Sequence, residues 1–166
     1  MELFLFLCYN GYGEIMKKVF ILLSLFLLVG CTNKIKEGNC KINLKNSDEN
    51  YTLKANYKIY YDKNEYVTKI EESATYKSDD DSVLDFYYKA KSMEYQNLYN
   101  YGGIEYSVEL IDNKVKIIST REVKDMDVKK LIKDKLIDRD YTSANRLTLY
   151  GMKDYYEAKG AVCDIE

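Results

Sequence analysis

Histidine is absent from this 166-residue chain, as are proline and tryptophan. Without histidine, a Ser-His-Asp or Cys-His catalytic system cannot be assembled, and imidazole-ligated metal sites are excluded. No CxxC pair occurs, so the usual thiolate metal and redox motifs are missing too. Basic and acidic residues are interleaved at a net charge of −2, and no basic stripe indicates nucleic-acid binding. We therefore expect no catalytic residues, no metal ligands and no cofactor.

Tyrosine, by contrast, is abundant, with 18 copies. A tyrosine ring is apolar and its hydroxyl is polar, so such a supply suits a surface that binds carbohydrate or peptide. Tyrosine is also favoured in strands and cores. We favour the second interpretation and keep the first open.

The most informative segment is residues 16–31, where an apolar run follows two lysines and ends in a cysteine. Lys17 and Lys18 form a basic start, and Val19–Val29 is an apolar run shorter than the roughly 20 residues needed to span a bilayer. Leu28-Val29-Gly30-Cys31 then matches the lipobox, in which the cysteine thiol receives a diacylglyceryl group and cleavage leaves that cysteine at the N-terminus. The segment predicts a lipid-anchored protein on the extracytoplasmic face of the cell membrane.

Four segments follow from this interpretation. Residues 1–15 read as a mis-assigned N-terminal extension, 16–30 as the signal peptide, 31–38 as a polar tether and 39–166 as one domain. The alternative for the N-terminal part is an uncleaved signal anchor or a longer hydrophobic N-terminus.

Alternation of apolar and polar residues predicts strands in the mature domain. Tyr51–Tyr61 and Tyr66–Tyr76 have this period of two, separated by the turn residues 62–65. A second hairpin is expected from Ile104 to Ser119, with its turn at 112–113. Residues 161–163 are short and strand-like.

Three helices are expected between and after these hairpins. The first begins at Ser82, buries one face and stops at Gly102-Gly103; its expected buried residues are Val83, Phe86, Tyr87, Ala90 and Met93. Asp127 caps a short helix through Ile137, and Thr148 caps the last helix, which ends near Gly160. The pattern predicts an α+β fold, with an antiparallel β-sheet built from hairpins and packed by one central helix and two C-terminal helices.

Carboxylates and lysines supply the remaining candidates for chemistry. Glu71 and Glu72 are interpreted as solvated residues of a strand. Lys129, Lys130 and Lys133 are interpreted as solvated residues of the second helix. Residues 79–81 are three aspartates, but they lack the alternate spacing of a calcium loop and suit a helix N-terminus.

The cysteines divide by position. Cys31 is the expected lipid acceptor, while Cys40 and Cys163 stand near the two ends of the domain. In an oxidising compartment such a pair favours a disulfide over catalysis, and two free thiols are the alternative.

The order of these elements resembles the YehR-like family of small bacterial lipoproteins of unknown function. The similarity is strongest in residues 57–69, 103–109 and 147–160 and covers nearly all of the mature domain. The resemblance implies this α+β fold and brings no catalytic residue with it.

Three functions remain open. The favoured one is a noncatalytic, membrane-anchored binding or interaction module of the cell envelope, with a protein, glycan or small ligand as its partner. The alternatives are an envelope enzyme that uses Asp, Glu, Tyr or Lys chemistry, and a structural or inhibitory scaffold. A pocket with convergent carboxylates favours the enzyme, an aromatic groove favours ligand binding, and a filled core favours the scaffold.

Replacement of the lipid acceptor tests the anchor. We expect Cys31→Ala to release the protein from membranes or to leave an uncleaved precursor, because stable anchoring takes at least two acyl chains. Metabolic labelling with a fatty-acid analogue, followed by fractionation, measures both effects. A wild-type protein that takes up no label contradicts the assignment.

Overall fold

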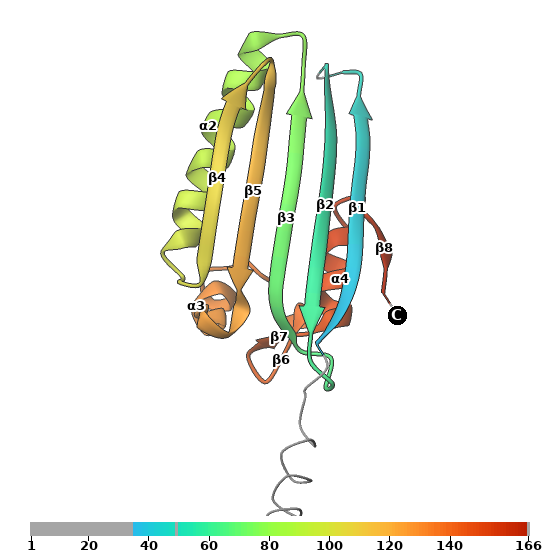
Figure 1. The fold of residues 1–166 in the computed structure, drawn as a ribbon. Coiled ribbons are helices and arrows are strands. Elements are labelled where there is room, and N and C mark those ends of the chain that lie inside the picture. The colour runs from blue at the N-terminus through green and yellow to red at the C-terminus, as the bar shows by residue number, and fades with distance from the viewer. Residues whose placement is uncertain (1–34, 49, 166) are drawn as a thin grey trace, which may run out of the picture. The chain divides into compact units, whose positions relative to one another are not determined.

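Six antiparallel strands form the main sheet of the protein, in the order β4-β5-β3-β2-β1-β8. The computed structural model describes residues 35–48 and 50–165 (Figure 1). The strands are β1 (Lys36–Asn46), β2 (Tyr51–Tyr61), β3 (Val67–Lys77), β4 (Ile104–Ile111), β5 (Lys114–Glu122) and β8 (Val162–Asp164). A small hairpin of β6 (Thr142–Ser143) and β7 (Arg146–Leu147) stands apart. The sheet confirms the antiparallel α+β prediction.

The tight turns explain the register of the two hairpins. Asp112 and Asn113 both have positive φ, at 47° and 54°, as a two-residue turn between antiparallel strands requires. Between β2 and β3, Asp62 accepts hydrogen bonds from the backbone N–H groups of Asn64 and Tyr66. The hairpin strands lie where the alternation predicted them, within a few residues.

Among the described residues, three α-helices accompany the sheet: α2 (Asp81–Tyr99), α3 (Val128–Lys133) and α4 (Leu149–Glu157). Asp127 and Thr148 cap α3 and α4 as expected, each accepting a hydrogen bond from a backbone N–H. The expected start of the first helix was wrong: Asp80 is the cap, and it accepts from the N–H of Ser82. Figure 1 shows α2 and α4 on the same face of the sheet, and within the described ranges the other face carries no helix.

The buried face of α2 differs from the expected one. Leu84 and Tyr95 are buried, whereas Phe86 and Met93 are each 65% exposed. The hydroxyl of Tyr95 donates a hydrogen bond to Glu72 in the sheet, and this bond turns the Leu84 and Tyr95 side of the helix inward. Apolar spacing alone did not reveal this polar anchor.

Two boundaries also shift. Strand β1 begins at Lys36, so the last residues of the expected tether belong to the sheet, where Gly38 pairs with Ile59. Helix α3 ends at Lys133 rather than Ile137, because Lys135 adopts a φ of 58° that no α-helix continues.

The residues from Ile35 onward form a compact unit with its own core and disulfide. A fragment of residues 32–166, the expected mature domain, should therefore fold independently. No helix among the described residues has the length and apolar character needed to cross a bilayer. The predicted extension, signal peptide and lipid acceptor, residues 1–31, lie outside the described residues.

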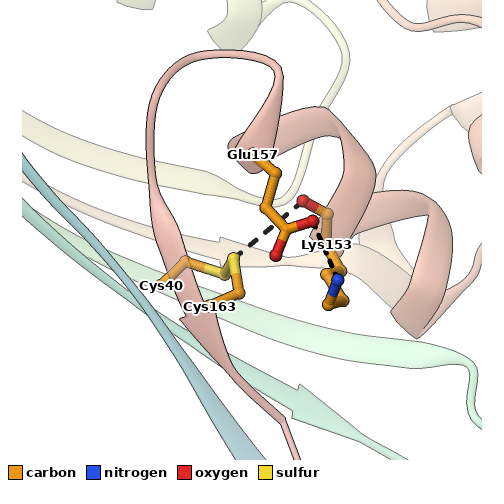
Figure 2. Close-up of a disulfide and its surroundings, with 4 residues drawn as sticks. All are labelled: Cys40, Lys153, Glu157 and Cys163. Atoms are coloured by element: carbon orange, nitrogen blue, oxygen red, sulfur yellow. Dashed lines mark hydrogen bonds and ion pairs between the residues drawn. A yellow bond between two sulfur atoms is a disulfide. The ribbon is translucent and has the colours of Figure 1, made fainter.

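A disulfide joins Cys40 on β1 to Cys163 on β8 at one edge of the sheet. The two residues face each other across the strands with their Cα atoms 4.0 Å apart. In Figure 2 the sulfur of Cys163 points to the backbone carbonyl of Lys153 in α4, at 3.9 Å, beside the Lys153–Glu157 ion pair. The bond thus fastens the C-terminal strand next to the helix that covers β1.

Removal of this bond tests its contribution. The cysteines are 123 residues apart, for which the chain-entropy model gives an upper expectation of about 5 kcal/mol. We expect Cys40→Ser with Cys163→Ser to lower the thermal midpoint of the mature domain strongly.

Reductant supplies the control. It should lower the wild-type midpoint towards that of the double variant and leave the double variant unchanged. Two free thiols in secreted wild-type protein, found by non-reducing mass spectrometry, would contradict the pairing.

Candidate functional site

A cavity of about 540 Å³ lies between the core face of the sheet and the helices. This volume falls within the usual range for small-molecule sites. Residues of all five long strands form its floor, and residues of α2, α3, α4 and the segments beside them form its walls. Most of the lining is aliphatic or aromatic, including Leu53, Ile70, Tyr76, Leu98, Leu136 and Met152.

Two oppositely charged residues stand in this floor because of strand alternation. Glu72 follows Ile70 on the inward face of β3, and Arg121 follows Ser119 on the inward face of β5. In the register, Glu72 lies opposite Ser119 and Ile70 lies opposite Arg121. The two charges are therefore diagonal neighbours on adjacent strands.

The carboxylate of Glu72 is held by three donors. Arg121 Nη2 lies 2.8 Å from Glu72 Oε2, and the side chains of the pair are 14% and 6% exposed, respectively. The Ser119 hydroxyl donates to the same oxygen at 3.3 Å, and the Tyr95 hydroxyl of α2 donates to it as well. Arg121 Nη2 also donates to the Tyr95 oxygen at 3.2 Å. The cluster links β3, β5 and α2 beneath the cavity.

A stacked tyrosine pair adjoins this cluster. The rings of Tyr57 on β2 and Tyr156 on α4 have centroids 4.2 Å apart. Tyr57 is also the β2 neighbour of Glu72 in the register. Within the described residues, the Tyr156 hydroxyl and Arg121 Nε are buried without a hydrogen-bond partner. Both residues line the cavity.

Burial keeps the hydroxyls of this site protonated. It raises the pKa of Tyr57, and the charge of Glu72 adds to the effect. Burial also raises the pKa of Tyr95 and Tyr156, although the charge of Arg121 works against it. At neutral pH these groups are neutral donors rather than bases or nucleophiles.

The expectation that Glu72 is solvated was wrong. Glu71 points the other way, keeps a 37% exposed side chain and binds Lys69 at 2.6 Å, as expected of a surface residue. Glu72 occupies a period-two position in an otherwise apolar face of β3. Arg121 occupies such a position on β5, where Ser119 is the other polar residue of the inward face. Opposite charges at inward positions of two strands are the sequence signal for this pair.

The other predicted residues lie away from the cavity floor. Lys129, Lys130 and Lys133 are exposed on α3, as predicted. Of the aspartates 79–81, Asp80 serves as the α2 cap. Across residues 35–48 and 50–165, no cluster of histidine, cysteine or acidic side chains is suited to hold a metal ion. Cys40 and Cys163 form the disulfide at the sheet edge.

Comparisons with protein-family models and with curated proteins find no match to the sequence. Among solved structures, the chain is similar to the NMR structure of the E. coli YehR protein, with a TM-score of 0.48 and 17% sequence identity. The match covers 78% of this chain and 92% of that chain. The matched structure has the YehR-like fold that the sequence resembles. The match transfers no residue role to this chain.

Neutralisation of the buried carboxylate tests the polar cluster. We expect Glu72→Gln to lower the free energy of unfolding by roughly 3 kcal/mol, because it leaves the buried guanidinium of Arg121 without its counter-charge. Chemical denaturation of the mature domain measures this change.

The adjacent residue is the matched control. Glu71→Gln removes the same charge from the exposed face of the same strand and should cost less than about 1 kcal/mol. Equal losses in the two variants would contradict the burial of Glu72.

Proposed function

We propose that the protein is a noncatalytic binding module of the bacterial cell envelope that takes a small, largely apolar ligand into the cavity over its sheet. The single observation that carries this proposal is the cavity itself, with a volume of about 540 Å³ and a mostly aliphatic and aromatic lining. Such a lining, with a few convergent polar groups, is typical of small-molecule sites.

The incomplete burial of the sheet's core face supports the binding of a ligand. Leu44 faces inward at the end of β1 yet remains 43% exposed, and Leu53 on β2 is half-buried. Both residues line the cavity. A ligand seated there would remove this apolar surface from water, at about 25 cal/mol for each Å² buried. A scaffold with a filled core would leave no such surface.

The tyrosines support the same proposal. Tyr57, Tyr76, Tyr95 and Tyr155 line the cavity beside Tyr156. Their flat rings offer stacking surfaces, and their hydroxyls offer polar contacts at low conformational cost. The core interpretation and the binding interpretation of the tyrosines are therefore compatible, since the same rings pack in the core and line the cavity.

The carboxylates favour binding over hydrolysis. A two-carboxylate hydrolase needs one acid free to protonate a leaving group and a second carboxylate about 5 to 9.5 Å away. Among the cavity residues, Glu72 accepts three hydrogen bonds, and Glu94 is paired with Lys91 at 2.7 Å. Both carboxylates are engaged in holding the structure.

The place in the envelope is the second part of the proposal. It rests on the lipobox ending at Cys31. A diacylated cysteine would keep the domain anchored at the membrane surface. The membrane would be a partner through this lipid, and no nucleic-acid partner is proposed, because basic and acidic residues are interleaved without a basic stripe.

Binding of a neutral fluorescent probe tests the cavity. We expect N-phenyl-1-naphthylamine to bind the mature domain at one saturable site with a rise in fluorescence. Leu53→Trp should weaken this binding at least tenfold, because the larger side chain occupies the floor of the cavity.

The control is the same substitution elsewhere. Leu110→Trp changes a 47% exposed leucine on β4, outside the cavity lining, and should leave the affinity unchanged. Absence of saturable binding, or equal binding by Leu53→Trp and wild type, would contradict the proposal.

A further inference from the structure

Two buried hydrogen-bond donors belong to residues that line the cavity and have no acceptor among the described residues. Tyr156 is 2% exposed, and neither its hydroxyl nor Arg121 Nε has a partner within the described residues. Buried polar groups in folded proteins nearly always have one. Since both residues line the cavity, an acceptor atom from a bound molecule would satisfy them.

The side chains that carry the two donors lie in the same part of the core. Tyr156 on α4 stacks on Tyr57, which lies opposite Glu72 in the register of β2 and β3. Glu72 in turn binds Arg121 on β5. The ring of Tyr156 is held by its stack on Tyr57, and Arg121 is held by Glu72. The donors are therefore preorganised by contacts that do not use their free N–H and O–H groups.

Charge balance decides what kind of acceptor fits. Glu72 already neutralises Arg121, so a ligand carboxylate would place two anions beside one cation in a poorly hydrated site. Lys91, the other inward cation, is neutralised by Glu94. Lys159 is exposed at the cavity edge, where solvent screens it and its ammonium group lies over the Tyr155 ring. An uncharged acceptor fits this floor better than an anion does.

We propose that the ligand is a neutral, mainly apolar molecule whose carbonyl oxygen accepts hydrogen bonds from the Tyr156 hydroxyl and from Arg121 Nε. The inference rests on the proposed binding function and adds the chemical class of the ligand. The rest of the molecule occupies the aliphatic and aromatic part of the cavity, over Leu53 and Ile70.

Three naphthalenes of similar size test the assignment by displacement of N-phenyl-1-naphthylamine. 2-Acetylnaphthalene carries a ketone, 2-naphthoate carries an anion and 2-ethylnaphthalene has no acceptor. We expect the ketone to bind about three- to tenfold more tightly than either of the others at neutral pH, as one or two satisfied hydrogen bonds imply.

One hydroxyl is then removed. Tyr156→Phe keeps the ring and its stack, and should reduce the preference for the ketone over 2-ethylnaphthalene, because one of the two donors is lost, while leaving the affinity for 2-ethylnaphthalene unchanged. Tyr150→Phe is the matched control on the same helix; Tyr150 is 58% exposed and lies outside the cavity lining, so the ketone preference should persist. Because the readout compares two ligands on one variant, a general loss of stability does not imitate it.

A second measurement uses the wild-type protein. The NMR resonance of the Arg121 Nε–H group should shift on addition of the ketone and move less with the hydrocarbon. Three results overturn the inference and leave the binding function intact: tightest binding of 2-naphthoate, a ketone preference that Tyr156→Phe does not reduce, or an Arg121 resonance that the ketone does not move. Failure of the fluorescent probe and of all three naphthalenes to bind overturns both proposals.

Discussion

The buried ion pair between Glu72 and Arg121 is the constraint on which the arrangement around the cavity depends. Removing two charges from water is costly, and here the cost is offset by their 2.8 Å contact and by the hydroxyls of Ser119 and Tyr95. The Tyr95 bond reaches from the sheet to α2 and sets which side of that helix faces inward. The same pair supplies the polar floor of the cavity, so helix placement and site chemistry have a common origin.

Part of the cavity lies where long strands of the sheet meet short helices. Strands β1, β2 and β3 each have 11 residues, whereas α4 has nine and α3 has six. Helices α2 and α4 lie on one face of the sheet (Figure 1), and the inward Leu44 and Leu53 remain partly exposed. The disulfide secures β8 beside α4, so the wall that carries Tyr156 is fastened to the sheet through Cys40 (Figure 2).

Local patterns in the sequence were sufficient to predict the strands and helices, but they were insufficient to predict the residues of the site. Period-two alternation located β2 and β3, and the caps Asp127 and Thr148 located α3 and α4, because these signals act between residues close in the chain. The inward face of α2 could not be predicted, since it depends on Tyr95 meeting Glu72, 23 residues away. The role of Arg121 could not be predicted for the same reason. A charged residue on the inward face of a strand indicates a buried ion pair only when the opposite charge is known to lie beside it.

A double-mutant cycle on Glu72→Gln and Arg121→Met tests the account most directly. If the pair is buried and mutually dependent, the loss in unfolding free energy of the double variant should be smaller than the sum of the single losses by about 2 to 3 kcal/mol. Additive losses, with a coupling energy near zero, would show that the two side chains do not interact and would contradict the polar floor on which both the helix placement and the ligand site rest.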